Sequence, residues 1–134
     1  MADMLLDRTL FDDLRSGDAA ARAMVESILD GDIQAAISPL TVFELWQSGD
    51  IDRRTEIGFL SVLRFVEEAP PDIETARTAG LLAADYQKGD ESHSLERDVS
   101  YIALVAATAI QLDIPICTRA ADAFAQFGVE IIAY

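Results

Sequence analysis

Residues 33 to 48 read IQAAISPLTVFELWQS and carry the clearest fold signal in the chain. The first part of this stretch, from Ile33 to Ser38, is short and apolar, which is typical of a buried strand. Pro39 follows, and proline suits the first turn of a helix, where its missing N–H is not needed. The residues up to about Ser48 then predict a helix. The chain therefore passes from a buried strand directly into a helix.

The same alternation extends along most of the chain. The apolar run Met4-Leu5-Leu6 ends at Asp7, and Thr9 can cap a helix that stops at Gly17. This pattern predicts an α/β fold, with a parallel sheet of about five strands and helices on both faces. We expect further helices at about 18–30, 51–64, 74–87, 98–112 and 120–127, further strands at 114–118 and 129–133, a poorly marked strand at 65–66, and a loop at 89–94.

Length and composition indicate a single α/β domain over residues 1–134, of which 51% are hydrophobic. No apolar run approaches the roughly 20 residues of a membrane span, and the first residues do not resemble a signal peptide. The single cysteine, Cys117, makes no internal disulfide, and a buried apolar role is expected for it. These features predict a cytoplasmic protein without membrane contact.

The charge is strongly acidic, with 24 Asp and Glu against 10 Lys and Arg and a net charge of −14. Such self-repulsion is best tolerated where salt screens it, so we expect a halophilic source. The same charge argues against nucleic-acid binding through a broad basic patch. Contact with a nucleic acid would have to be local, metal-assisted, or made in high salt.

Four carboxylates map to one edge of the predicted sheet. Asp7 ends the first strand, Glu44 lies early in the helix after the second, Asp98 opens the buried helix, and Asp122 follows the 114–118 strand. Ligands of such sheets bind at the carboxyl ends of the strands. Clustered carboxylates repel one another unless a cation lies among them, and their oxygens suit Mg²⁺ or Mn²⁺. Such ions can support phosphodiester hydrolysis without a covalent intermediate.

These residues resemble the PIN-domain family, especially its small VapC-type toxins. Leu5-Leu6-Asp7 is similar to the family's opening motif, and residues 38–44 (SPLTVFE) resemble its second motif. The resemblance implies that Asp7 and Glu44 bind the metal ion. Residues 105–109 and 114–119 look like the third and fourth blocks. The resemblance extends over nearly the whole chain.

The sequence departs from the family pattern at several positions of the acid set. Arg8 and Thr9 replace the usual Thr-Asn pair, and Ile102 stands where the third acid belongs. Asp98 is one turn earlier on the same helix face, so its carboxylate would need a displacement of ~6 Å to take the place of the third acid. Ala120 stands where the fourth block usually has Asn or Asp. Another family Asp would fall next to Asp122.

Each candidate residue also has an ordinary structural explanation. Asp7 can cap a helix, Glu44 can be a solvated helix carboxylate, and the helix dipole alone favours acids such as Asp98 and Asp122 in a first turn. His93 is expected to be solvated. We expect Arg8 and Arg119 to approach the acidic edge, Trp46 and Tyr101 to be core or interface residues, and Leu10, Phe11 and Leu14 to form a dimer face.

Two functions from different classes follow. The first is a metal-dependent endoribonuclease of the toxin–antitoxin type, with Asp7, Glu44, Asp98 and Asp122 as catalytic acids, the first three also as ligands of Mg²⁺ or Mn²⁺. Its implied partners are an RNA substrate, a small antitoxin protein and a second copy of the chain. The alternative is a catalytically inactive PIN-like module that binds a protein or RNA, which Ile102 and Ala120 favour. A weaker third possibility is an unrelated doubly wound signalling domain.

Overall fold

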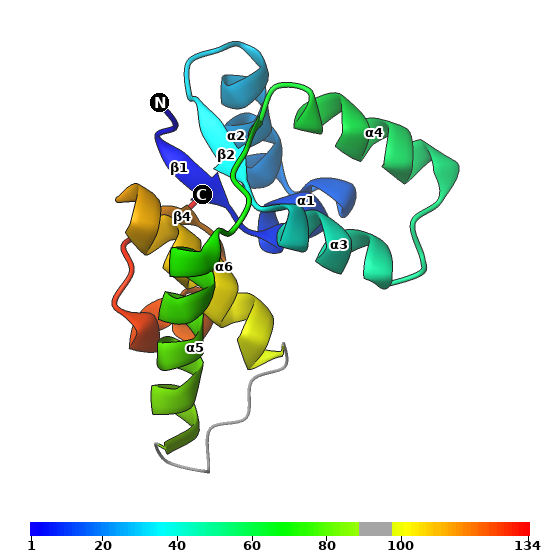
Figure 1. The fold of residues 1–134 in the computed structure, drawn as a ribbon. Coiled ribbons are helices and arrows are strands. Elements are labelled where there is room, and N and C mark those ends of the chain that lie inside the picture. The colour runs from blue at the N-terminus through cyan, green and yellow to red at the C-terminus, as the bar shows by residue number, and fades with distance from the viewer. Residues whose placement is uncertain (89–97) are drawn as a thin grey trace.

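The computed structural model describes residues 1–88 and 98–134 and contains a five-stranded parallel sheet (Figure 1). The strand order is β3-β2-β1-β4-β5, and every neighbouring pair is parallel. The strands are β1 Met4–Leu6, β2 Ala35–Ile37, β3 Glu67–Glu68, β4 Ile116–Cys117 and β5 Ile131–Ile132. The helices are α1 Arg8–Arg15, α2 Ala19–Leu29, α3 Pro39–Gln47, α4 Arg53–Leu63, α5 Ile73–Lys88, α6 Val99–Leu112 and α7 Ala121–Phe124, followed by the 3₁₀ turn η1 Ala125–Phe127.

Side chains of the central strands alternate between two cores, one on each face of the sheet. Leu6 and Ile37 contribute to the core under α1, α2, α3 and α4, whereas Leu5 and Ala36 contribute to the core under α5, α6 and α7. This alternation follows from the two-residue period of a strand. Figure 1 shows α1 to α4 grouped apart from the α5–α6 pair. The predicted fold class, a parallel sheet with helices on both faces, is confirmed.

Strand register places three polar residues in one row at the carboxyl edge. Leu6 is the register partner of both Ile37 and Cys117. The next residue of each strand is therefore Asp7, Ser38 or Thr118, and all three are at most 1% exposed. Buried polar groups need hydrogen-bond partners. This row is the base of the candidate site.

The expected bounds of the helices and strands were largely confirmed, with two differences, at the start of α1 and at β3. The N-cap of α1 is Asp7, and Thr9 lies inside the helix. The poorly marked strand forms at Glu67–Glu68, just after the apolar pair at 65–66, where Ala36 and Ile37 of β2 supply its register partners. Pairing with an existing strand edge therefore formed β3 where local propensity was weak.

The predicted dimer face on α1 is wrong for two of its three residues. Leu10 is 0% exposed and Phe11 is 1% exposed. Phe11 packs edge-on against Phe59 of α4, with ring centroids 5.3 Å apart. Their apolar surface is thus already buried within the chain itself. The amphipathic pattern identified a buried face but could not say whether α4 or a second chain covers it.

Two further expectations concern membranes and the loop at 89–94. In the part of the chain that the structure describes, no helix is both long and apolar enough to cross a membrane. The predicted loop and His93 lie outside the described residues.

Candidate functional site

Asp7 is fully buried, and its carboxylate does not cap the helix that follows. It is 0% exposed, and although it is the N-cap residue of α1 its side chain makes no cap hydrogen bond. Instead, the Thr118 hydroxyl donates a hydrogen bond to Asp7 Oδ2 at 2.7 Å. The helix-capping explanation of Asp7 therefore fails. A carboxylate in this position is costly to bury, which favours a functional or strongly compensated role.

A network of hydroxyl groups joins the end of β1 to the end of β4. Thr118 Oγ1 lies 3.1 Å from Thr9 Oγ1 and accepts the backbone N–H of Ala120 at 2.9 Å. Thr9 Oγ1 in turn accepts the backbone N–H of Arg119 at 3.0 Å. These contacts fix the orientation of the hydroxyl that binds Asp7. Sequence reasoning missed Thr118, although a polar residue directly after an apolar strand was the available signal.

Glu44 is the second buried acid at this edge, and an arginine binds it. It is 5% exposed on α3, and Arg8 Nη1 donates to Glu44 Oε2 at 3.3 Å. Arg8 Nε also donates to Asp12 Oδ2 at 3.0 Å. Burial disfavours the Arg8 charge, but the hydrogen bond and charge of Asp12 and the charge of Glu44 outweigh burial and raise the Arg8 pKa. The solvated-carboxylate explanation of Glu44 is wrong.

Thr41 lies one turn before Glu44 on the same buried face of α3. Thr41 is 1% exposed, and within the described residues its Oγ1 is a buried side-chain atom with no hydrogen-bond partner. Native proteins leave few such atoms, and each one points to a ligand, a water molecule or stored strain. The unsatisfied hydroxyl beside Glu44 therefore fits a site that takes a further polar group. We call Asp7, Arg8, Thr41, Glu44 and Thr118 the acid site.

The other two predicted acids do not join this site. Asp98 is exposed and caps α6, with its Oδ1 accepting the N–H of Ser100 at 2.8 Å, and Asp122 is exposed in α7. Ile102, at the position of the missing acid, is 0% exposed in the core. Within residues 1–88 and 98–134, no three His, Cys, Asp or Glu side chains gather as a metal site. A catalytic role for Asp98 or Asp122 stays a prediction.

The side chains of the acid site fit a divalent cation as a partial site. Mg²⁺ is commonly held by one or two carboxylates together with water and substrate phosphates, without a complete protein cage. Asp7 and Glu44, with the unsatisfied Thr41 hydroxyl, fit such a partial site. They do not form a three-carboxylate site with Asp98. Any cation at Glu44 also has to compete with the guanidinium of Arg8.

Arg119, the second arginine expected at this edge, binds a different group of acids. Its Nη2 lies 2.8 Å from Asp18 Oδ2, and its guanidinium lies 4.6 Å from the centroid of the Tyr134 ring. The Tyr134 hydroxyl donates to Asp13 at 2.6 Å. We call Asp13, Asp18, Arg119 and Tyr134 the surface ion cluster. It ties the end of the chain to α1 and the start of α2.

The aromatic residues that the sequence singled out pack against other rings. Trp46 lies edge-on to Phe59 and donates its indole N–H to Glu56 at 2.9 Å. Tyr101 stacks on Phe43, with centroids 6.1 Å apart. The core or interface role expected for Trp46 and Tyr101 agrees with these contacts.

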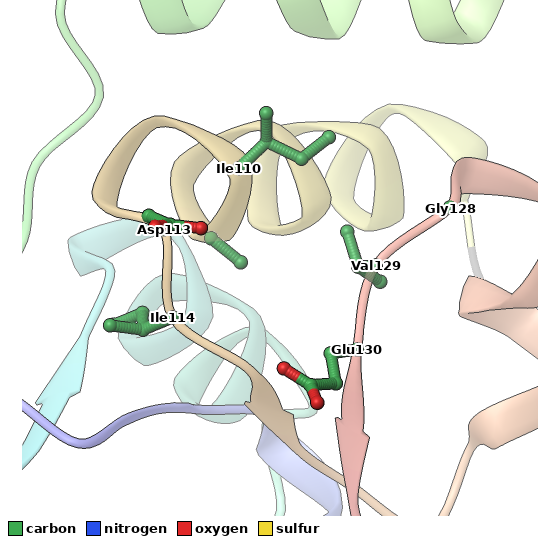
Figure 2. A pocket seen from close by; sticks show the side chains of 7 residues that line it. Ile110, Asp113, Ile114, Gly128, Val129 and Glu130 are labelled. Carbon is green, nitrogen blue, oxygen red and sulfur yellow. The ribbon is translucent and has the colours of Figure 1, made fainter.

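A pocket of about 280 Å³ lies at the opposite edge of the sheet. Figure 2 shows Ile110, Asp113 and Ile114 on one side of it and Val129 and Glu130 on the other. These residues precede β4 and β5, so the pocket is at the amino ends of the strands. It shares no residue with the acid site and does not support the predicted chemistry.

Comparisons with known proteins identify the fold. No family model matches the chain, and no curated protein does either. A chain of a toxin–antitoxin complex from Klebsiella pneumoniae is 22% identical, with a TM-score of 0.69 over 96% of this chain and 95% of that one. A chain of DNA-bound VapBC from Salmonella typhimurium is 18% identical, with a TM-score of 0.76 over 99% and 98%. A chain of VapBC2 from Rickettsia felis, bound to promoter DNA, is 13% identical, with a TM-score of 0.76 over 98% of both chains.

Similarity at this level of identity establishes the fold, and it does so over nearly the full length of each chain. The strand order and the position of the acid site agree with the sequence motifs at Asp7 and Glu44. The chain therefore has the PIN-like fold that its motifs resemble, the same fold as chains of the VapBC toxin–antitoxin complexes.

Proposed function

We propose that this chain is a toxin-type endoribonuclease that hydrolyses RNA phosphodiesters with Mg²⁺ or Mn²⁺ in the cytoplasm. The observation that carries the proposal is the burial of two carboxylates, Asp7 at 0% and Glu44 at 5% exposure, at the carboxyl edge of the sheet. Burying a carboxylate lowers the stability of the fold. A functional role therefore explains better than folding does why two carboxylates are buried there.

Some residues of the acid site would bind the cation, and others orient the residues that bind it. The Thr118 hydroxyl holds the Asp7 carboxylate in one orientation, and α3 presents Glu44 beside the unsatisfied hydroxyl of Thr41. With Asp7 and Glu44 as its ligands, a bound divalent cation would supply an activated water molecule and charge neutralisation at the phosphate. Asp98 and Asp122 are exposed, so we propose that any assistance from them runs through water.

A small protein partner completes this proposal. The structural neighbours are toxin–antitoxin complexes, and several of them contain DNA. This chain carries a net charge of −14, which makes direct contact with DNA unfavourable and contact with a basic protein favourable. We propose that an antitoxin-like partner places a basic side chain on the acid site. A homodimer stays part of the proposal, with a face other than Leu10 and Phe11.

RNA cleavage by purified protein tests the enzyme directly. The assay uses a mixed RNA substrate with Mn²⁺ in high KCl, because salt screens the repulsion of so acidic a chain from RNA. We expect Asp7→Asn and Glu44→Gln to abolish cleavage. The matched controls Asp30→Asn and Glu26→Gln change exposed carboxylates on α2 and its end, and cleavage should persist. Equal cleavage by all four variants would assign the activity to a contaminant or to another site.

A second function, a module that binds a partner without cutting RNA, has specific support. Ile102 is fully buried where the family pattern has its third acid, and Arg8 already neutralises Glu44. Both features reduce the need for a cation. Absence of cleavage by the wild-type chain across RNA substrates and across Mg²⁺ and Mn²⁺ concentrations would favour this second function over the first.

A further inference from the structure

The ion pair at Glu44 places a cation of the protein where a metal ion would bind. Arg8 Nη1 lies 3.3 Å from Glu44 Oε2, and Glu44 is 5% exposed. The Arg8 side chain is 28% exposed, so its guanidinium is the more solvent-accessible member of the pair. One guanidinium therefore supplies the positive charge that a buried carboxylate requires.

Arg8 is held at two points, and only one of them belongs to the acid site. Its Nε bonds Asp12 at 3.0 Å, one turn along α1, and the Asp12 side chain is 43% exposed. The Nη1 contact with Glu44 can therefore break while the Nε contact with Asp12 remains. An arginine side chain has enough rotatable bonds for such an exchange without movement of the backbone.

We propose that Arg8 is a built-in competitor for the divalent cation: its guanidinium occupies Glu44, and metal binding requires it to withdraw toward Asp12. This inference rests on the proposed function only in using Asp7 and Glu44 as the cation site. It gives a functional reason for the arginine at position 8, where the family pattern has threonine. It also implies that the cation affinity of the site is set by a residue that binds no metal.

Binding of Mn²⁺ to the full chain, measured by electron paramagnetic resonance in high KCl, tests the proposal. Arg8→Gln keeps a polar side chain but removes the charge, and we expect it to bind Mn²⁺ about tenfold more tightly than the wild type. Arg15→Gln is the matched control. Arg15 is on the same helix but pairs with Asp50, 3.2 Å away, so its loss changes the net charge equally without touching Glu44.

The outcomes separate this proposal from the proposed function. An affinity gain in Arg8→Gln that is absent from Arg15→Gln and lost in the double variant with Glu44→Gln supports the competition. Equal affinities for wild type and Arg8→Gln, with RNA cleavage intact, overturn the Arg8 proposal and leave the nuclease standing. If Arg8→Gln binds Mn²⁺ more tightly but neither it nor the wild type cleaves RNA, the Arg8 proposal is supported and the nuclease is removed.

Two results would remove both proposals. One is a failure of both the wild type and Arg8→Gln to bind Mn²⁺ while circular dichroism shows that both chains are folded. The other is Mn²⁺ binding by Arg8→Gln that Asp7→Asn and Glu44→Gln leave unchanged. If Arg8→Gln does not fold, Arg8→Lys provides the same test. Lysine loses the planar two-point contact with Asp12 and Glu44, so we expect a smaller gain in Mn²⁺ affinity in the same direction.

Discussion

The acid site and the surface ion cluster both lie near the carboxyl edge of the sheet but differ in burial. Asp7 and Glu44 are at most 5% exposed, whereas the side chains of Asp18 and Arg119 are 30% and 41% exposed. The surface ion cluster has the shorter ion pair, 2.8 Å against 3.3 Å at Glu44. Water screens that shorter pair, so distance alone does not rank the two groups.

Because it is buried, the acid site is more sensitive to substitution than the surface ion cluster. Removing a partner from a buried charge leaves the charge without compensation, whereas an exposed charge recovers its interactions with water. The acid site should therefore respond strongly to small chemical changes, and the surface ion cluster weakly.

The largest effect is expected for Thr118→Val, which deletes the hydroxyl bound to Asp7 and keeps the shape of the side chain. Loss of a hydrogen bond to a buried charge should lower the free energy of unfolding by about 2 kcal/mol. Urea denaturation at fixed high KCl measures it. Thr41→Val is the matched control, because Thr41 is equally buried but its hydroxyl has no partner among the described residues. Equal destabilisation by both substitutions would contradict our account of the acid site.

The next effect is a loss of stability at alkaline pH caused by Cys117, the neighbour of Thr118. Burial, and then the charge of Asp7, raise the Cys117 pKa to about 12 from its ordinary value of 9.0. Above pH 9 the unfolded chain therefore releases this proton while the folded chain keeps it, which favours unfolding. We expect the free energy of unfolding to fall by about 1.5 kcal/mol between pH 8 and pH 10.

Urea denaturation at both pH values measures this change, with Cys117→Ala as the control. The variant lacks the titrating group, so its stability should depend less steeply on pH over the same interval. If the free energy of unfolding of Cys117→Ala fell as steeply between pH 8 and pH 10 as that of the wild type, the raised pKa of Cys117 would not be the cause of the loss of stability.

The smallest effect is expected for Arg119→Ala in the surface ion cluster. The substitution removes contacts with Asp18 and with the half-buried Tyr134 ring, yet the side chains of Arg119 and Asp18 are 41% and 30% exposed. We expect the Tm to fall by less than about 2 °C at high KCl, because salt screens exposed pairs. Differential scanning calorimetry at low and high KCl measures this. A fall in Tm as large as the one measured for Thr118→Val in the same buffer would contradict the distinction between the two groups.

The local features of the fold could be predicted from the sequence because they depend on neighbouring residues. The alternation of apolar strands and amphipathic helices predicted the parallel sheet, whereas the cap expected at Thr9 proved to be too late in the chain, because the N-cap of α1 is Asp7. The topology then placed Asp7 and Glu44 at one edge. Each of these inferences uses a spacing of a few residues, or the rule that parallel strands end at the same edge.

The partners of the two buried acids were decided by the tertiary structure. The contact between Asp7 and Thr118 joins residues 111 positions apart, and that between Arg8 and Glu44 joins residues 36 apart. Likewise, α4 buries Phe11, which the sequence had assigned to a dimer face. Strand register and helix packing set these contacts, and no local pattern encodes them. The apolar and charged side chains, and the helices that hold them, can be read from the order of the residues. The pairs of charges that meet cannot, because only packing brings distant residues within hydrogen-bonding distance.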